Sequence, residues 1–342
     1  MTAATLKMTE AVVVSATMQA VAQRRYGGPE TLEVTERARP EPKTGEVLVQ
    51  VKAAGLDRGT WHLMTGRPYL MRLVFGFSAP KDPVRGRELA GVVTAVGPGV
   101  TRFAVGDAVF GIGEGTFAEF ACAREDKLAR KPARWSFAEA AASAISALTA
   151  IQALDAAQVK AGEQVLVVGA SGGVGTFLLQ LARARGAHCT AVSSAGKAAL
   201  VRSLGAETVI DYAREDFTAR DQRFDVILDV GGNTALSKLR RVLAPTGRLV
   251  FVGGENGGDI TAGFGRQLLA MVLAPFTRQR FLPFLTKERS LELDQLAALA
   301  EQGLLKTVID REVPLTGVAD AMRALEAGQV RGKIVVMPTA RG

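Results

Sequence analysis

Short runs of alternating hydrophobic and polar residues dominate the first third of the chain. The clearest runs are residues 46–51, 89–96 and 107–110, and glycine-rich turns follow the last two. Such alternation is typical of strands that bury one face, with turn residues separating them. The pattern therefore predicts a compact, largely antiparallel β region from Met18 to about Lys131.

The pattern changes at residue 136. Ser136 is in position to cap an alanine-rich helix that extends to about Leu154, and strands and helices then alternate to about Leu285. The expected strands are residues 164–169, 188–193, 208–211, 224–229 and 248–253. Because strands that alternate with helices pair in parallel, this part of the chain predicts a doubly wound parallel sheet.

The last part of the chain returns to mixed elements. It predicts a helix, a strand, a second helix and a closing strand at residues 291–302, 308–313, 316–327 and 333–337. A segment of this size is too small to fold alone, so we expect it to join the first β region. The expected organisation is one domain formed by residues 1–135 and 287–342, with a second domain, residues 136–286, inserted in it.

The most informative motif follows the first strand of the parallel sheet. Residues 165–168 run directly into a turn that contains Ser171, Gly172, Gly173, Val174 and Gly175, and a helical pattern continues to residue 185. A turn of this kind directs N–H groups at an anion, and the glycines let a pyrophosphate approach without Cβ clashes. Small residues also allow close packing of a helix on a strand, but a second strand follows here, as the motif requires. The turn therefore predicts a dinucleotide site.

The residues after the second strand indicate which dinucleotide. An NAD-preferring site usually has an acidic residue about 20 positions beyond the turn, bonded to the ribose 2′-hydroxyl. Here that place holds Ser193 and Lys197, and no acidic residue lies between Glu163 and Glu207. Hydroxyl groups and a lysine suit a 2′-phosphate, which a carboxylate would repel. We expect NADP(H); the alternative places Lys197 in the first turn of a solvated helix.

Composition excludes several classes of protein. At 342 residues and 48% hydrophobic content, the chain has enough apolar residues for a sizeable core, which argues against disorder. The net charge of +8 raises the possibility of nucleic-acid binding, but the basic residues are dispersed. No apolar run approaches the ~20 residues of a membrane span. We therefore expect neither a nucleic-acid nor a membrane partner, and a small molecule as the substrate.

The cysteines and the N-terminal residues indicate the cellular compartment. Cys122 and Cys189 lie in different predicted domains and form no disulfide framework, which favours a reducing cytoplasm. Residues 1–17 lack the basic region and cleavage site of a signal peptide. We expect them to be a poorly ordered extension of a cytoplasmic protein.

With these motifs in order, the chain resembles the medium-chain dehydrogenase/reductase superfamily, specifically its zinc-free quinone oxidoreductase branch. The resemblance covers nearly everything from Met18 onward. Its motifs are residues 51–56, 86–93, 105–110, 115–120, 169–175, 204–206, 211–212, 224–229 and 332–336. It implies an α/β protein: a GroES-like, mainly β catalytic domain with a Rossmann NADP(H)-binding domain inserted. Substrate and nicotinamide then meet between the two.

The resemblance also implies particular cofactor contacts. It assigns Ser171, Gly172, Gly173 and Val174, in the turn that ends at Gly175, to the pyrophosphate. It assigns Ser193, Lys197 and Tyr212 to the 2′-phosphate of NADPH. Tyr212 has an alternative role, as a half-buried residue that caps the third strand of the parallel sheet.

A metal site is not expected. Zinc-dependent relatives have a cysteine where this chain has Asp57, and a histidine where it has Arg87. A guanidinium cannot ligate a cation and repels one. His62 and Glu88 remain, but a catalytic zinc needs about three ligands, and we interpret His62 as packed or surface-exposed.

Without a metal, the natural reaction is hydride transfer from NADPH to a quinone or an α,β-unsaturated carbonyl. The candidate catalytic residues are Tyr69, in a loop expected to border the cleft, and Asp57, where the family usually has asparagine near the nicotinamide. A carboxylate at this position accepts a hydrogen bond from the carboxamide, or simply caps the following turn. For both residues a structural role is the alternative. The alternative function is a non-catalytic NADPH-binding sensor or RNA-binding protein, although no aromatic stacking motif favours RNA.

Residues 264–285 are apolar but carry Arg266, Arg278 and Arg280. This segment either walls the substrate pocket or leads into an edge strand, residues 280–285, that pairs with its copy in a homodimer. An unpaired apolar edge promotes aggregation, and dimerisation removes it.

Overall fold

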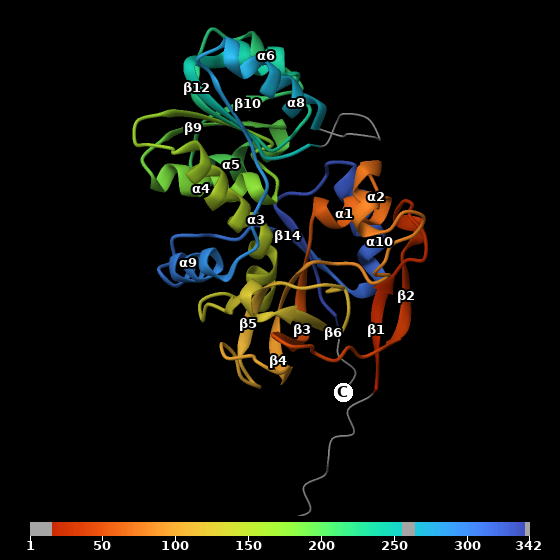
Figure 1. Cartoon of the computed structure of the whole chain (residues 1–342). Helices are drawn as coiled ribbons and strands as arrows, with labels where there is room; N and C mark the ends of the chain where they lie inside the picture. The colour runs from red at the N-terminus through yellow and green to blue at the C-terminus, as the bar shows by residue number, and fades with distance from the viewer. Residues whose placement is uncertain (1–15, 255–263, 339–342) are drawn as a thin grey trace, which may run out of the picture.

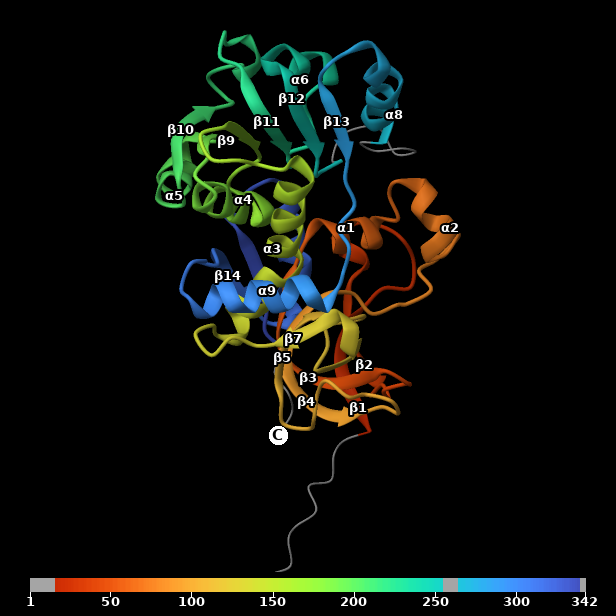
Figure 2. The ribbon, with the colours of Figure 1, turned by 60° about the vertical axis from the view of Figure 1, so that its left-hand side comes forward.

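The computed structural model describes residues 16–254 and 264–338. Two units lie one above the other, and the long helix α3 (Phe137–Ala157) runs between them (Figures 1 and 2). The upper unit is a sheet flanked by helices, and the lower unit is mainly β. Most of the expected N-terminal extension, residues 1–15, lies outside the described residues.

The upper unit contains a six-stranded sheet in the order β10-β9-β8-β11-β12-β13, in which every pairing is parallel. Its strands are β8 (Gln164–Val168), β9 (His188–Ser193), β10 (Ala206–Asp211), β11 (Phe224–Asp229), β12 (Leu243–Phe251) and β13 (Arg280–Pro283). Its helices are α4 (Gly173–Ala184), α5 (Ala198–Ser203), α6 (Leu236–Val242) and α8 (Phe264–Leu273). The doubly wound parallel sheet predicted from the sequence is confirmed.

Both faces of this sheet are covered. Val165 and Val167 pack in the cluster that contains α3 and α4, whereas Leu166 and Val168 pack in a second cluster with α6. Successive side chains of a strand point to opposite faces, so β8 is apolar at nearly every position. The strand order reverses between β8 and β11, and the carboxyl ends of strands at such a reversal are where sheets of this kind usually bind ligands.

The lower unit contains a seven-stranded sheet with the path β14-β15-β3-β4-β5-β7, and β6 pairs with β3. Its strands are β3 (Glu46–Leu56), β4 (Glu88–Val96), β5 (Ala108–Ile112), β6 (Phe120–Arg124), β7 (Leu128–Arg130), β14 (Ile309–Val313) and β15 (Lys333–Val336). A separate hairpin joins β1 (Thr17–Ala22) to β2 (Glu33–Ala38). The pairings are antiparallel except for β14 with β15, as expected for this region.

The C-terminal tail lies in the lower unit. β15 pairs antiparallel with β3, and Ile334 lies opposite Leu56. The helices of the lower unit are α1 (Arg58–Thr65), α2 (Arg72–Phe75), α9 (Ser290–Glu301) and α10 (Val318–Glu326). The exact division into residues 1–135, 136–286 and 287–342 stays a prediction. The pairing of β15 with β3 is compatible with it.

Helix α3 joins the two units through a shared core. Ser136 caps it: the hydroxyl accepts a hydrogen bond from Glu139 N at 3.1 Å, and the Glu139 carboxylate accepts from Ser136 N at 2.8 Å. One continuous hydrophobic cluster around α3 includes Phe110 of the lower unit and Val167 of the upper one. The small side chains of α3 therefore let sheets from both units pack closely against it.

Candidate functional site

The glycine turn gives α4 a sharp start over the end of β8. Gly169 has a φ of +82°, in the left-handed region that favours glycine. A Cβ at Gly175 would lie 2.4 Å from the Gly169 carbonyl oxygen, so only glycine fits there. The first turn of α4 is thereby held against the carboxyl end of β8, where the strand order of the parallel sheet reverses.

The N-terminus of α4 is open to a ligand. Gly172 is its N-cap, and no side chain among the described residues caps it. The N–H groups of Gly173, Val174 and Gly175 have no partner within the helix, because the helical ladder begins later. Gly172, Gly173 and Val174 are partly exposed, and a Cβ at Gly172 would meet only one atom, at 3.6 Å. These groups fit the pyrophosphate of a dinucleotide.

Residues of the lower unit reach this turn. Gly332 N donates to the Ser171 carbonyl oxygen at 2.8 Å, and Gly332 forms a bridge with Gly172. The side chain of the next residue, Lys333, passes beneath Gly173, where a Cβ would lie 2.8 Å from Lys333 Cδ. The start of β15 therefore supports the candidate cofactor turn through main-chain and side-chain contacts.

A buried ion pair lies below this contact. The Lys333 ammonium binds Glu88 Oε2, and Ile145 N of α3 donates to Glu88 Oε1 at 2.7 Å. The Glu88 side chain is fully buried. Burial raises the pKa of Glu88 to about 7, Lys333 opposes this shift, and the negative charge of nearby Asp57 adds to it. The pair thus links β4, α3 and β15 beneath the site.

The residues predicted at the 2′-phosphate have different surroundings. Ser193 ends β9 with a buried side chain, whereas Tyr212 follows β10 with 62% of its surface exposed. Lys197 Nζ donates to the carbonyl oxygens of Gly328 at 2.9 Å and Val330 at 2.8 Å. Burial lowers the pKa of Lys197, and the charge of Arg331 lowers it further.

One acidic residue near this end escaped the sequence analysis. Asp211 pairs with Ser193 in the register of β10 and β9, so a carboxylate lies beside a span that is free of acids along the chain. Its Oδ1 accepts from Ala213 N at 3.2 Å, and its Oδ2 is 3.7 Å from Arg214 Nε. Asp211 and Ser193 are 18 positions apart in the sequence, and only the parallel pairing of β10 with β9 brings them side by side.

Asp57 caps α1 with one oxygen and leaves the other unused. Its Oδ1 accepts from Thr60 N at 2.6 Å, as the structural alternative predicted. Its Oδ2 is buried and has no hydrogen-bond partner in the described part of the chain. An unsatisfied buried acceptor is costly, so this oxygen is suited to a donor on a ligand.

Tyr69 and Asp57 belong to different elements. Tyr69 begins the 3-10 turn η2 (Tyr69–Met71), is 42% exposed, and has the Arg72 guanidinium 4.7 Å from its ring centroid. Among the described residues, no hydrogen bond joins Tyr69 to Asp57 or Arg87. A catalytic role for Tyr69 stays a prediction.

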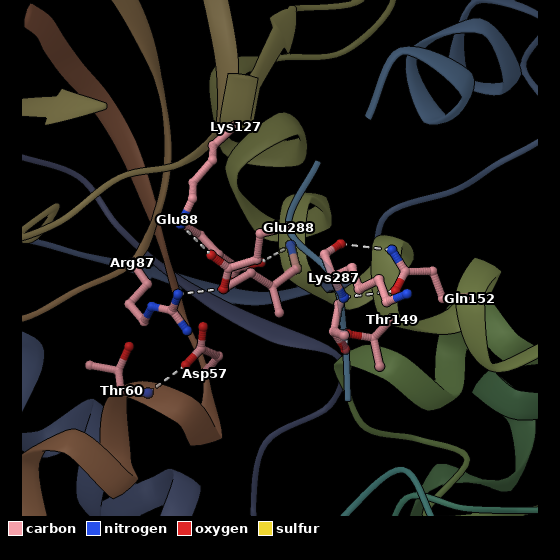
Figure 3. Close-up of polar contacts among 11 residues, drawn as sticks. Asp57, Thr60, Arg87, Glu88, Lys127, Thr149, Gln152, Lys287 and Glu288 are labelled. Carbon is pink, nitrogen blue, oxygen red and sulfur yellow. Dashed lines mark hydrogen bonds and ion pairs between the residues drawn. The ribbon is translucent and has the colours of Figure 1, made fainter. Parts of the chain in front are cut away.

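Arg87 and Lys127 share one carboxylate, that of Glu288 (Figure 3). Arg87 donates through Nη2 to Glu288 Oε1, and Lys127 Nζ lies 3.0 Å from Glu288 Oε2. Glu288 belongs to the connector, residues 284–289, which descends from β13 to α9 (Figure 2). No motif marks Glu288 in the sequence, so its role was missed.

Helix α3 holds the other side of the connector (Figure 3). Gln152 Nε2 donates to the Lys287 carbonyl oxygen at 2.7 Å, and Lys287 N donates back to Gln152 Oε1 at 2.8 Å. The hydroxyls of Thr149 and Thr286 are 2.9 Å apart. The connector is therefore fixed on both sides, which sets the position of Glu288.

Comparison with known proteins decides the family. The family model described as "Alcohol dehydrogenase GroES-like domain" matches residues 43–133, and the one described as "Zinc-binding dehydrogenase" matches residues 204–336. A chloroplast envelope quinone oxidoreductase homolog of Arabidopsis thaliana is 32% identical over 340 residues, which cover 94% of this chain and 98% of the relative. The chain belongs to the quinone oxidoreductase branch of the medium-chain dehydrogenase/reductase superfamily. It is an oxidoreductase.

Two further comparisons agree with this family. A chloroplastic NADPH-dependent alkenal/one oxidoreductase of Arabidopsis thaliana is 31% identical over 339 residues, covering 94% of this chain and 80% of the relative. The solved structure of the quinone oxidoreductase from Coxiella burnetii superposes with a TM-score of 0.83 at 29% identity. That match covers 95% of this chain and 100% of the other. The resemblance noted from the sequence motifs is confirmed.

The residues considered as zinc-ligand positions, Asp57, His62 and Arg87, make contacts within the protein. Within residues 16–254 and 264–338, no group of three or more His, Cys, Asp or Glu side chains is placed to hold an ion. His62 is half-buried, and its Nδ1 lies 2.8 Å from the Arg67 carbonyl oxygen. The Arg87 guanidinium forms an ion pair with Glu288.

Arg266 of α8 has a structural contact that the sequence did not indicate. It donates to Asp229 Oδ2 and the Thr234 carbonyl oxygen, both at 2.7 Å, and to the Gly253 carbonyl oxygen at 3.3 Å. Burial raises the pKa of Asp229, and Arg266 opposes this shift. Arg266 thus joins the loops that follow β11 and β12.

One described helix is long and apolar enough to cross a membrane by length and composition. It is α3, and 78% of its most apolar window is buried inside the structure. Its role as the shared core of the two units accounts for that composition.

Proposed function

We propose that this chain is an NADPH-dependent reductase that delivers hydride to a quinone or an α,β-unsaturated carbonyl without a metal ion. One observation carries the proposal. The site combines an open helix N-terminus at Gly172, which fits a dinucleotide, with Asp57 and Arg87, a pair that does not fit a metal. The names of the relatives support quinones and enones as the acceptor class.

The pyrophosphate end of the cofactor is proposed to bind at the start of α4. The partners are the main chain of residues 171–175, where Ser171 is fixed by Gly332 and the following N–H groups are open. When bound, the nicotinamide cofactor supplies the hydride.

The 2′-phosphate is proposed to bind near Ser193, Lys197 and Tyr212. An ammonium group has more N–H donors than the carbonyls of Gly328 and Val330 take up, so Lys197 keeps a donor for an anion. Arg331 adds positive charge nearby. Asp211 opposes an anion here, but its contacts with Ala213 N and Arg214 reduce that effect.

Asp57 is proposed to orient the reacting end of the cofactor. Its buried Oδ2 accepts a hydrogen bond from the nicotinamide carboxamide, while Oδ1 continues to cap α1. An alkoxide is a much stronger base than an enolate or a hydroquinone monoanion, and Asp57 and Arg87 do not fit the metal ion that would offset this difference, so alcohol oxidation is disfavoured. Tyr69 is proposed to affect acceptor preference from the edge of the site.

Turnover assays with purified protein test this function. NADPH oxidation is expected to be fast with quinones or enones and negligible with simple ketones, and chelators are expected to leave it intact. Elemental analysis is expected to find well under one zinc per chain. Stoichiometric zinc with chelator-sensitive turnover, or tight NADPH binding without turnover of any quinone or enone, contradicts the proposal.

We also propose a cytoplasmic homodimer. β13 ends the strand order, and no described strand pairs with its outer edge. The adjacent helix α8 exposes a group of apolar side chains, Leu268, Leu269, Met271 and Val272. Both cysteines are free, and burial raises the pKa of Cys122 to about 11 and of Cys189 to about 12, which keeps them as thiols.

A further inference from the structure

We propose that the Arg87 guanidinium stabilises the negative charge that develops on the acceptor oxygen during reduction. This inference rests on the function proposed above for the same site. It supplies an electrophilic group for the reaction at Arg87, whereas Tyr69 forms no hydrogen bond with Asp57 or Arg87 in the described chain.

The local backbone directs Arg87 and Glu88 to different surroundings. The Glu88 side chain is fully buried against α3 and Lys333, whereas 33% of the Arg87 side chain is exposed. Figure 3 shows Arg87 reaching into the region between Asp57, at the start of α1, and Glu288 on the connector.

The Arg87 guanidinium has N–H donors beyond the one that binds Glu288. Its Nη2 binds Glu288, and in residues 16–254 and 264–338 no other acceptor takes its remaining N–H groups. None of the Arg87 nitrogens is among the buried unpaired atoms, so the remaining donors are open to solvent or a ligand. A planar array of N–H groups with one side fixed and the other open suits an oxyanion.

The charges around Arg87 leave it effective as a cation. Glu288 is shared with Lys127, so two positive groups contact one carboxylate. Glu88 is matched by Lys333, and Asp57 is stabilised at the N-terminus of α1. The connector therefore holds the Arg87 guanidinium in place without cancelling the positive charge of the cluster.

The chemistry requires such a group. An enone takes up hydride at its β-carbon, its C=C electron pair moves toward the carbonyl, and the oxygen becomes an enolate. A proton from water then adds to the α-carbon. A quinone that takes up hydride becomes a hydroquinone monoanion, which water protonates. In both cases charge appears on an oxygen, where fixed N–H donors are most effective.

The two acceptors differ in their need for Arg87. An enolate is a stronger base than a hydroquinone monoanion, so its formation depends more on stabilisation by a donor. In Arg87→Met, kcat/KM is expected to fall about 10²–10³-fold with an enone but only about tenfold with a quinone. Arg87→Lys is expected to recover part of the enone activity. A purely structural role instead lowers both activities by the same factor, which overturns the inference.

Lys127→Met is the matched control. It removes the other cation of Glu288 but leaves the N–H donors of Arg87, so the enone activity is expected to fall much less than in Arg87→Met. If Lys127→Met reproduces the selective enone loss, the general charge of the cluster is responsible, and the specific role of Arg87 is wrong.

A probe of binding tests Arg87 without turnover. Para-nitrophenol, whose phenolate resembles the reduced acceptor, is titrated spectrophotometrically on the protein saturated with NADP⁺. The wild type and Arg87→Lys are expected to favour bound phenolate over bound phenol, and Arg87→Met is expected to lose this preference. An unchanged titration in Arg87→Met overturns the inference. If the wild type reduces neither acceptor, the proposed function fails, while this titration still decides whether Arg87 stabilises an oxyanion.

Discussion

At the scale of single residues, Lys197 connects two parts of the chain that are distant in sequence. It follows β9, yet its ammonium binds the carbonyl oxygens of Gly328 and Val330 before β15. The sequence suggested its role from the absence of acids around it. It could not show the carbonyl contacts or the register that places Asp211 beside Ser193, because both depend on tertiary structure.

Lys197→Ala tests the cofactor preference. The wild type is expected to bind NADPH at least about tenfold more tightly than NADH, a difference of ~1.4 kcal/mol. The substitution is expected to weaken NADPH binding and leave NADH binding nearly unchanged, because only NADPH carries the 2′-phosphate. Fluorescence titration of both cofactors measures this. If the affinities for NADPH and NADH fall by the same factor, Lys197 acts only by holding residues 328–330.

At the scale of elements, strongly periodic segments were predicted well. The bounds of β9 and β11 agree with the sequence analysis, and both are largely buried strands of the parallel sheet. β12 begins at Leu243, earlier than expected, because the strand continues through Pro245 and Gly247. These turn-forming residues hid its first half. The contacts that fix the connector could not be predicted, because Glu288 belongs to no sequence motif.

Two alanine substitutions at the start of α4 separate folding from binding. Gly175→Ala places a Cβ 2.4 Å from the Gly169 carbonyl oxygen, so α4 must shift, and both stability and NADPH affinity are expected to fall. Gly172→Ala meets its nearest atom at 3.6 Å, so stability is expected to persist. Its Cβ occupies space where the pyrophosphate approaches, and NADPH binding is expected to weaken. Urea unfolding and cofactor titration measure the two effects. If Gly172→Ala binds NADPH normally, the turn does not hold the pyrophosphate.

At the scale of the whole molecule, the buried Glu88–Lys333 pair couples stability to pH. The pKa of Glu88 rises from 4.5 to about 7 on burial, so between these values the folded protein binds more protons than the unfolded chain. The free energy of unfolding contributed by this group therefore falls as the pH rises from about 4.5 to about 7. Urea unfolding across this range is expected to show that slope in the wild type, and Glu88→Gln is expected to remove it.

The same substitution has a second effect. Glu88→Gln puts an N–H donor where either the Lys333 ammonium or Ile145 N needs an acceptor, so the free energy of unfolding is expected to fall by about 1–3 kcal/mol. The double variant Glu88→Gln/Lys333→Met is expected to recover much of this loss, because the ammonium that competes for the acceptor is gone. If the double variant is no more stable than Glu88→Gln, the ion pair is not the source of the loss.

The proposed homodimer makes a further prediction at this scale. Val272→Lys places a charge on the exposed face of α8 beside the edge strand β13. It is expected to weaken association and lower the mass measured by light scattering toward that of one chain. Val105→Lys, at an equally exposed apolar residue of the lower unit, is the control and is expected to leave the mass unchanged. A wild type that is monomeric at high concentration contradicts the dimer.

The main-chain bond from Gly332 to Ser171 has a consequence for protein engineering. The upper unit is not a self-contained module, because a segment near the C-terminus bonds to its glycine turn and supplies the acceptors for Lys197. A chimaera that receives only residues 136–286 from an NADH-dependent relative would place a foreign turn against the original Gly332. Grafts intended to change cofactor preference must therefore carry residues 328–333 of the same donor.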